Sequence, residues 1–269
     1  MNPDPHAIGL DSPAAFACPQ GSPASAVGAA LAAIGLTGPR PVLILVGGAA
    51  NLDAKVAVRL CPLFRDLVPV LDRLGAAVID GGTHFGVMAL MGEARQQASG
   101  RFPLIGMAPR GRVAFPYPGT TTPENSRPVP ELDPAPYRSA WQDRQEPRVA
   151  LDPHHSHFLL VPGECWGDES PWLMAVAERL AIGRATLMLV AGGGEITRRD
   201  ILHRLRQSGR ILALAGSGGT AEALVAWRRG KGPLPVDDQA GFAPALVEVL
   251  DLMEAPGQLP RLVAQALAC

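Results

Sequence analysis

The sequence predicts an α/β fold of Rossmann-like type, a three-layer sandwich in which a mainly parallel sheet is flanked by helices. Three observations predict it. Short apolar runs alternate with amphipathic segments of helical length, so one strand-then-helix unit repeats along the chain. The apolar runs are nearly continuous, as in strands that are buried on both faces of a parallel sheet. Each run also ends in a turn that contains glycine.

The units follow one another in a simple order. Predicted strands cover residues 42–46, 76–79, 103–107, 158–161, 186–190 and 211–214. Predicted helices reach to residue 74 after the first strand and then cover 85–97, 170–182, 197–207 and 220–229, and two closing helices are expected at 242–253 and 259–267. Because parallel neighbours require crossover connections, all six glycine-containing turns should lie at the carboxyl edge of the sheet, where ligands of open α/β sheets bind.

Two segments fall outside these units. Residues 1–39 are read as a leader, with a short apolar helix at 22–35 and a role in oligomer contact as one interpretation. The interruption at 115–149 holds eight prolines and no clear period, and a lid over the sheet edge and a surface excursion without a role both remain open. The remainder, residues 40–269, is expected to form a single domain.

Composition narrows the class of protein. The formal net charge is -1, which disfavours nucleic acid and anionic membranes as partners because both require clustered positive charge. The four cysteines form no CxxC pair, which fits a reducing cytoplasm. No apolar run reaches the roughly 18 residues of a spanning helix. We therefore expect a cytoplasmic protein with no membrane association.

Glycine directly after a strand lets backbone N–H groups approach an anion closely, and the helix that follows adds its positive end. Four turns combine these features: Gly47-Gly48, Gly81-Gly82-Thr83, Gly192-Gly193-Gly194 and Gly216-Ser217-Gly218-Gly219. This arrangement suits phosphate or pyrophosphate. None of the turns matches GxxxxGK[ST] or a clean GxGxxG, which disfavours P-loop hydrolysis and ordinary dinucleotide dehydrogenation.

Other polar residues have more than one interpretation. His154, His155 and His157 suggest a metal pair, buried hydrogen-bonded histidines or direct ligand contacts, and the sequence leaves these open. Trp166 could stack on a base and Glu164 could accept ribose hydroxyls. Acidic residues at predicted helix starts, Glu195 among them, could equally complement the helix dipole. No Ser-His-Asp arrangement is supported.

Five segments carry a family resemblance, and they occur in this order: Gly81 to Met88, Leu104 to Gly111, Leu151 to Val161, Gly193-Gly194-Glu195 and Gly216 to Glu222. Together they resemble the SLOG superfamily, in the branch found at the N-terminus of melastatin-type TRPM channels and in stand-alone prokaryotic relatives. The match spans residues 41–227. The resemblance implies a domain that recognises NAD-derived or other nucleotide ligands, such as ADP-ribose, usually as a sensor.

The superfamily also includes LOG-type phosphoribohydrolases with a PGGxGTxxE motif. Here the matching stretch begins Ala215-Gly216, and Ala223 stands where the motif has its glutamate. Within the closer branch, the usual arginine after GSG is Gly219 and the usual asparagine before HSH is His154. Arg110 or Arg112 is the candidate substitute for the missing arginine, whose fork would bind phosphate.

Two hypotheses follow. The first is a sensor in which Gly82, Thr83, Gly218 and Thr220 cradle phosphates and Glu164, Trp166 and His155 contact ribose or base. The second, which rests on the resemblance alone, is a nucleotide glycohydrolase that uses Glu195 or Glu222. The residues expected to contact the ligand are Gly47, Gly48, Gly81, Gly82, Thr83, His84, Gly86, Arg110, His155, His157, Gly163, Glu164, Trp166, Gly193, Gly194, Glu195, Gly216, Ser217, Gly218, Gly219, Thr220 and Glu222. No metal and no obligatory cofactor are expected, and the expected partners are a nucleotide-like ligand, a second copy of the chain and a separate effector protein.

Overall fold

A computed structural model describes residues 13–18, 21–49, 51–114, 148–236 and 241–268. Its main sheet has eight parallel strands in the order β1-β7-β4-β3-β2-β8-β9-β10. Their bounds are β1 Ala14–Ala17, β2 Val42–Gly47, β3 Ala77–Asp80, β4 Leu104–Pro109, β7 His157–Val161, β8 Thr186–Ala191, β9 Ile211–Ala215 and β10 Val247–Asp251. The six strands predicted from apolar runs are confirmed, each end within two residues.

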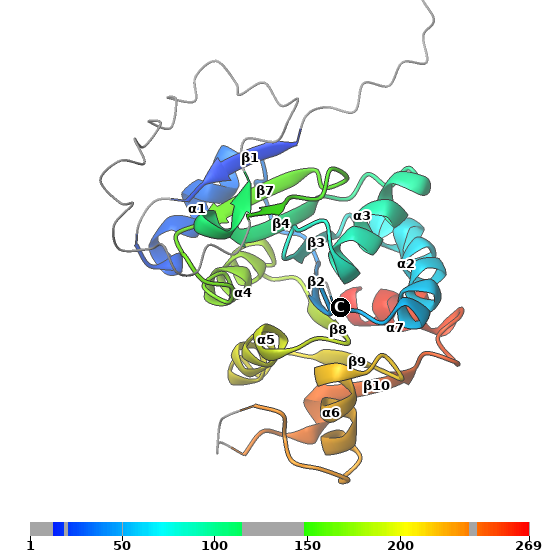
Figure 1. The fold of residues 1–269 in the computed structure, drawn as a ribbon. Helices are drawn as coiled ribbons and strands as arrows, with labels where there is room; N and C mark the ends of the chain where they lie inside the picture. The colour runs from blue at the N-terminus through cyan, green and yellow to red at the C-terminus, as the bar shows by residue number, and fades with distance from the viewer. Residues whose placement is uncertain (1–12, 19–20, 50, 115–147, 237–240, 269) are drawn as a thin grey trace, which may run out of the picture.

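Helices cover both faces of this sheet, which confirms the three-layer α/β sandwich (Figure 1). One layer holds α1 Pro23–Ala33, α4 Ser170–Leu180, α5 Glu195–Arg206 and α6 Gly219–Arg228; the other holds α2 Ala54–Leu74, α3 Gly86–Gln97 and α7 Gln258–Leu267. Alternate residues of β2 serve the two layers, because Ile44 packs in the first core and Leu43 in the second. Both side chains are fully buried, as the continuous apolar run predicted.

The longest helix shows how local sequence sets its bounds. The Asp53 side chain accepts hydrogen bonds from the N–H groups of Lys55 and Val56, at 2.7 and 3.3 Å, and so begins α2. Gly75 ends the helix in the left-handed conformation, with φ of 58°. No helix in the described ranges combines the length and the apolar character needed to cross a bilayer.

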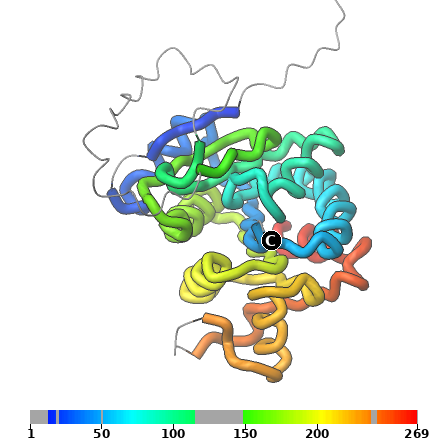
Figure 2. Tube along the Cα trace, in the orientation of Figure 1, coloured from blue at the N-terminus to red at the C-terminus, as the bar shows by residue number. Residues whose placement is uncertain are grey.

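Part of the predicted leader belongs to the sandwich. The predicted short helix is α1, and it packs against α4. Upstream of it, β1 pairs in parallel with β7 and forms one edge of the sheet. The chain trace shows this N-terminal segment beside β7 and α4, and α7 at the other end of the chain beside α2 (Figure 2). Residues 1–12 lie outside the described part of the chain.

Two predictions about elements are wrong. The closing helix expected at 242–253 is a 3₁₀ turn, Pro244–Leu246, followed by β10. The β-branched residues Val247 and Val249 favour a strand there, and the strand pairs with β9 along its whole length. The third unit also has no α-helix, because β4 leads into a 3₁₀ turn, Arg110–Arg112, and then into β5, Val113–Ala114.

The Pro-rich interruption lies almost entirely outside the described residues. Its last residue starts β6, Val149–Ala150, which pairs in parallel with β5. The chain then passes Thr83, forms a bridge to it at Leu151, and runs down beside α3 to the start of β7. Asp152 and His155 of this segment are buried, and Asp152 lies against Gly92 of α3.

Candidate functional site

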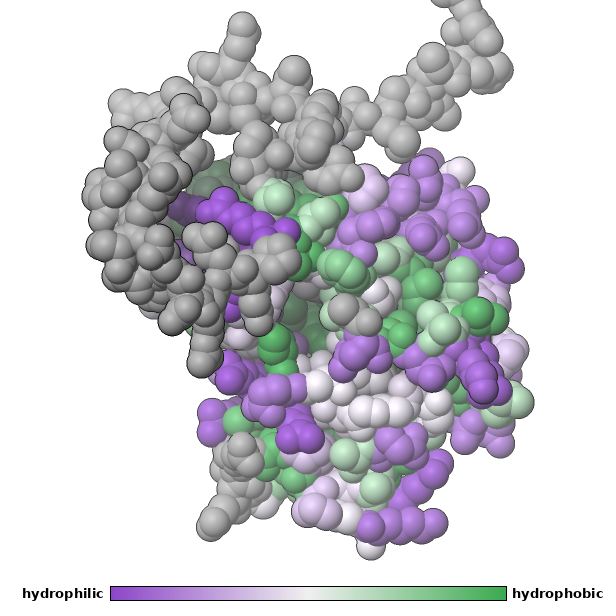
Figure 3. Space-filling model, viewed as in Figure 1, coloured by the Kyte–Doolittle hydropathy of each residue, from purple (hydrophilic) through white to green (hydrophobic). Residues whose placement is uncertain are grey.

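The strand order gathers the four glycine turns. They follow β3, β2, β8 and β9, which are consecutive neighbours in the sheet. From β2 the chain moves outward on one side through β3 and β4, and later fills the other side through β8 and β9. The topological switch point therefore lies between β2 and β8, where open α/β sheets bind ligands. Residues of intermediate hydropathy gather on this face near the starts of α5 and α6 (Figure 3).

The turns after β2 and β3 are built against each other. The Gly48 N–H donates to the Ala191 carbonyl at 2.9 Å, and the Gly48 carbonyl accepts from Val87 N–H at 3.0 Å. Gly86 has φ of 51°, and a side chain there would collide with the Gly48 carbonyl oxygen. Gly86 is therefore required by the close approach of α3 to the β2 turn, rather than by contact with a ligand.

The turns after β8 and β9 are braced in the same way. Gly192 N–H donates to the Ser217 hydroxyl at 2.9 Å, and the Gly193 carbonyl accepts from Thr220 N–H at 3.0 Å. The Thr220 hydroxyl donates to the Gly194 carbonyl, also at 3.0 Å. Ser217 and Thr220 are both buried. These two side chains, which are also expected ligand contacts, hold the two turns together.

Four amides at these turns have no protein acceptor. The N–H groups of Gly193, Gly194, Gly218 and Gly219 donate no hydrogen bond to any of the described residues. They lead directly into α5 and α6, so the positive ends of two helix dipoles add to them. Unpaired donors in adjacent turns at helix starts form an anion-binding arrangement.

Several other residues that are expected to contact the ligand make contacts within the protein. Gly82 N–H donates to the Asp80 carboxylate at 2.8 Å, and Gly216 N–H donates to the Glu222 carboxylate at 2.8 Å. Thr83 is buried and bridged to Leu151. Glu222 thus fixes the β9 turn. Glu195 is instead exposed, with Arg198 and Arg199 at 3.7 and 3.9 Å.

A buried chain of carboxylates and imidazoles lies below the β3 turn. The His155 side chain is inaccessible, and its Nδ1 and Nε2 each lie 2.8 Å from a carboxylate oxygen, of Asp152 and Asp80 respectively. The second oxygen of Asp152 accepts from His84 Nδ1 at 2.8 Å. Gly92 of α3 lies so close to Asp152 that a Cβ there would collide with the carboxylate. The ligand contact expected of His155 stays a prediction; in this structure its side chain is inaccessible and both ring nitrogens contact carboxylates.

The pKa shifts of His155 and Asp152 follow from their burial and their contacts. Burial alone would lower the pKa of His155, but the charges of Asp80 and Asp152 and their hydrogen bonds raise it to about 9. Burial would raise the pKa of Asp152, but hydrogen bonds from His155 and His84 lower it below its ordinary value. At neutral pH His155 is therefore an imidazolium between two carboxylates. Asp80 could have been noticed in the sequence as a carboxylate at the end of an entirely apolar run.

This imidazolium predicts a pH dependence of stability. The folded-state pKa of His155, about 9, lies above the unfolded value of 6.5, so its stabilising effect is complete below pH 6.5 and is lost as pH rises through 9. The loss is expected to reach up to about 3 kcal/mol of the free energy of unfolding. Urea unfolding at pH 6.5 to 9 measures it, with His155→Gln as control. A wild-type profile parallel to that of the variant would contradict the assignment.

His157 is placed at the other edge of the sheet. It is the first residue of β7, whereas the glycine turns lie beyond the last residues of their parallel strands. Its Nδ1 hydrogen-bonds to the Ser156 hydroxyl at 2.8 Å. Burial, together with the charges of Arg95 and Arg40, lowers the pKa of His157 to about 4. His155 and His157 thus have different partners. His157 was expected among the ligand contacts, but it lies at the opposite edge of the sheet from the glycine turns.

The loop after β7 reaches toward α5. The Asp168 carboxylate accepts from the N–H groups of Glu164 and Cys165, both at 3.0 Å, and fixes the loop. Trp166 is partly buried against Leu160 and its neighbours, whereas Glu164 is exposed. Gly167 lies against the Arg199 guanidinium, which brings this loop beside the start of α5. The loop that carries Glu164 and Trp166 therefore approaches α5 through Gly167.

Two carboxyl groups under this loop are buried. Burial raises the pKa of Glu169 and of Asp200 to about 7 each. Glu169 accepts from Gly167 N–H at 2.7 Å and so anchors the loop from below.

Arg110, expected near a phosphate, donates to the Cys18 carbonyl at 2.8 Å and holds the segment after β1. It follows β4, one strand farther out than β3.

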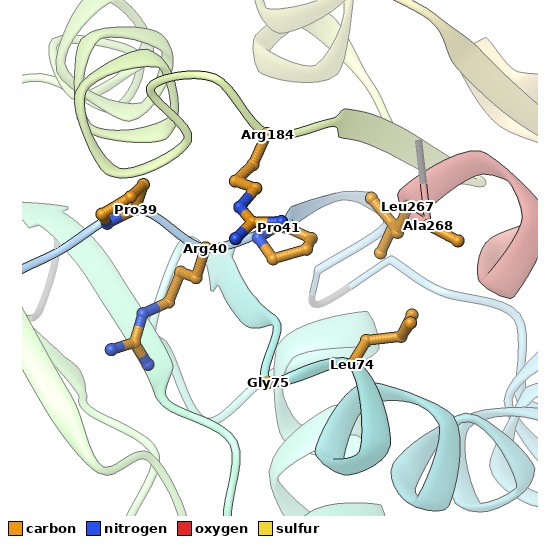
Figure 4. A pocket seen from close by; sticks show the side chains of 8 residues that line it. All are labelled: Pro39, Arg40, Pro41, Leu74, Gly75, Arg184, Leu267 and Ala268. Carbon is orange, nitrogen blue, oxygen red and sulfur yellow. The ribbon is translucent and has the colours of Figure 1, made fainter.

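Two surface hollows lie away from the glycine turns. One, of about 250 Å³, is lined by Arg40, Gly75, Arg184 and Leu267, among others, at the edge of the sheet where β2 begins (Figure 4). The other, of about 360 Å³, lies beside α6 and is lined by Arg198, Leu234 and Val236, among others. Neither lining contains a residue of the four glycine turns.

Comparisons with known proteins match most of the chain to one family. A family described as "SLOG in TRPM, prokaryote" matches residues 40–259. The chain is 29% identical over 212 residues to the transient receptor potential cation channel subfamily M member 2 of Mus musculus, which covers 71% of this chain. The Rattus norvegicus protein is 30% identical over 216 residues. The match spans only 13% of the length of either channel subunit.

Among solved structures, the molybdenum cofactor carrier protein of Chlamydomonas reinhardtii is 15% identical, with a TM-score of 0.46 over 84% of this chain and 99% of that one. The family match covers most of the sequence, including all four glycine turns. The domain is thus of the SLOG type, a nucleotide-binding Rossmann-like fold. The chain belongs to the family of prokaryotic SLOG domains related to those of TRPM channels.

Proposed function

We propose that the chain binds a nucleotide-derived ligand, NAD-derived or ADP-ribose-like, over the turns after β8 and β9, and that it acts as a sensor of that ligand. The observation that carries this proposal is the set of four unpaired amides at Gly193, Gly194, Gly218 and Gly219. Gly194, Gly218 and Gly219 are exposed and Gly193 is half-buried, so these amides face solvent and are free to donate to an anionic ligand.

The arrangement suits a diphosphate better than a single phosphate. Adjacent strands lie about 4.8 Å apart, so the two turns present their donors side by side. Each turn begins a helix, and each helix favours negative charge at its start. Two linked phosphate groups can therefore contact one turn each.

Side chains at the rim support contacts to the rest of such a ligand. Trp166 is partly buried against side chains of β4, β5 and β7, and the exposed carboxylate of Glu164 in the same loop can accept ribose hydroxyls. Arg198 and Arg199, each about half exposed on the first turns of α5, add positive charge on the same side. These residues come from the β7–α4 loop and from α5, the two segments that Gly167 brings together.

The catalytic alternative has weaker support. Glu222 already accepts the Gly216 N–H, and Glu195 is paired with two arginines in solvent, so neither carboxylate is positioned to stabilise a glycosyl cation.

Sensing requires an output, and we propose that the signal passes to a separate effector protein or to a second copy of this chain.

Isothermal titration calorimetry against ADP-ribose, cyclic ADP-ribose isomers, NAD and AMP tests the proposal. At least one diphosphate ligand is expected to bind with a sub-millimolar Kd, and adenosine, which lacks phosphate, is expected to bind at least about tenfold more weakly. Absence of binding across the panel would refute the proposed function. Release of free base in the same mixtures, detected by chromatography, would instead favour the glycohydrolase.

A further inference from the structure

We propose that His84 is a proton-carrying contact for a phosphate group of the ligand, and that the buried chain Asp80–His155–Asp152 positions it for this role. The inference rests on the proposed function and deepens it: His84, one of the expected ligand contacts, lies in the β3 turn, two strands along the sheet from the β8 turn. It starts from the junction of two glycine turns, where His84 stands between Gly82 and Gly86.

Of the four linked side chains, Asp80, His155, Asp152 and His84, only that of His84 is substantially exposed. Its side chain is 49% exposed, whereas Asp80, Asp152 and His155 are inaccessible. Its Nδ1 is held by Asp152 at 2.8 Å, and its backbone N–H donates to the Ala150 carbonyl at 3.0 Å. With Nδ1 occupied, Nε2 is the nitrogen left for a ligand. The ring is thus oriented from behind by a carboxylate that is itself hydrogen-bonded, the arrangement that fixes the tautomer of functional histidines.

The charges of Asp80, Asp152 and His155 favour protonation of His84 once an anion is bound. Two carboxylates and one imidazolium leave a net charge of -1 beneath the β3 turn when His84 is neutral. A phosphate placed there would be repelled, whereas protonation of His84 brings the group to neutrality and provides an N–H donor for the phosphate. Binding of the anion and uptake of a proton are therefore linked.

The surroundings of His84 in the described part of the chain are consistent with this coupling. Asp152 contacts His84 directly, His154 and His155 contact Asp152 from the same segment before β7, and Asp80 of β3 contacts His155. Arg95 of α3 is directed to the backbone, since it donates to the His154 carbonyl at 3.2 Å. α3 begins at Gly86, so its positive end favours an anion at the same place. Phe85, 42% exposed, provides an apolar surface next to the imidazole.

The test is calorimetry of the full chain with ADP-ribose at pH 7.5 in buffers of different ionisation enthalpy. ADP-ribose is the probe because its phosphates are diesters, without the titration near pH 6 of a phosphate monoester. Wild type is expected to take up between about 0.5 and 1 proton per ligand, and its affinity is expected to fall as pH rises from about 6.5 to 8.5. His84→Gln should bind about tenfold more weakly, with no proton uptake and a flat pH profile.

Two controls separate the possible failures. Asp152→Asn should lose the proton uptake while His84 is still present, which a merely structural role of His84 would not produce. Adenosine, which has no phosphate, should bind without proton uptake in every variant. Wild-type binding without proton uptake, or an unchanged uptake in His84→Gln, would overturn this inference and leave the proposed function standing. Absence of any ADP-ribose binding by wild type would overturn both.

Discussion

Gly86→Ala is expected to lower the free energy of unfolding by about 3–5 kcal/mol. Two effects add. Gly86 has φ of 51°, a conformation that costs a residue with a side chain about 1–2 kcal/mol. Its Cβ would also collide with the Gly48 carbonyl and approach the Ala49 carbonyl oxygen at 2.6 Å, and both are backbone atoms that cannot rotate away.

Gly75→Ala is the matched control, because Gly75 has a similar φ of 58° but no atom within 4 Å of a built Cβ. Gly75→Ala should lower the free energy of unfolding only by the cost of placing a side chain in the left-handed conformation, about 1 kcal/mol. Urea unfolding of both variants measures the difference. Equal losses would mean that the β2 and β3 turns are not packed as described.

Gly194→Leu is expected to reduce the affinity for ADP-ribose at least about 100-fold while the free energy of unfolding changes by less than about 1 kcal/mol. Gly194 has a negative φ, and a Cβ built there meets no atom within 4 Å. A leucine side chain there meets no protein atom near its Cβ, but it stands where the proposed phosphate contacts the Gly194 amide. The change removes space for the ligand rather than a contact within the protein.

Gly241→Leu controls for the added apolar side chain, since Gly241 also has open space around it and precedes β10 at the other edge of the sheet. Calorimetry and urea unfolding are run on both variants. Unchanged affinity in Gly194→Leu would place the ligand elsewhere, and a large loss of stability would show that the β8 turn is less open than described.

The strands of the sheet were predictable because each is a short apolar run that a turn ends abruptly. The β1 strand was missed because Ala14–Ala17 is mostly alanine, which carries little strand preference. The β10 strand was taken for a helix because Glu248 and Asp251 interrupt its apolar residues at the exposed edge of the sheet. The glycine turns were identified, but which of their amides are free depends on hydrogen bonds between different turns.

The buried charge chain was out of reach of local sequence analysis. His155 and Asp80 are 75 positions apart, and only the fold brings them within 2.8 Å. The histidine motif was noticed, and one of its open interpretations, buried hydrogen-bonded histidines, describes His155. Which histidine would remain exposed was not predictable, because His84 lies in a different segment and is joined to the motif only through Asp152.

NMR spectra of protein labelled with ¹⁵N-glycine, recorded with and without ADP-ribose, test most directly the claim that free amides at the β8 and β9 turns bind the ligand. The amide signals of Gly193, Gly194, Gly218 and Gly219 are expected to shift on binding. Those of Gly75, Gly183 and Gly230, which follow the C-terminal ends of α2, α4 and α6, are expected to stay in place. Binding that leaves the first four signals unmoved, or shifts only the second group, would contradict the account.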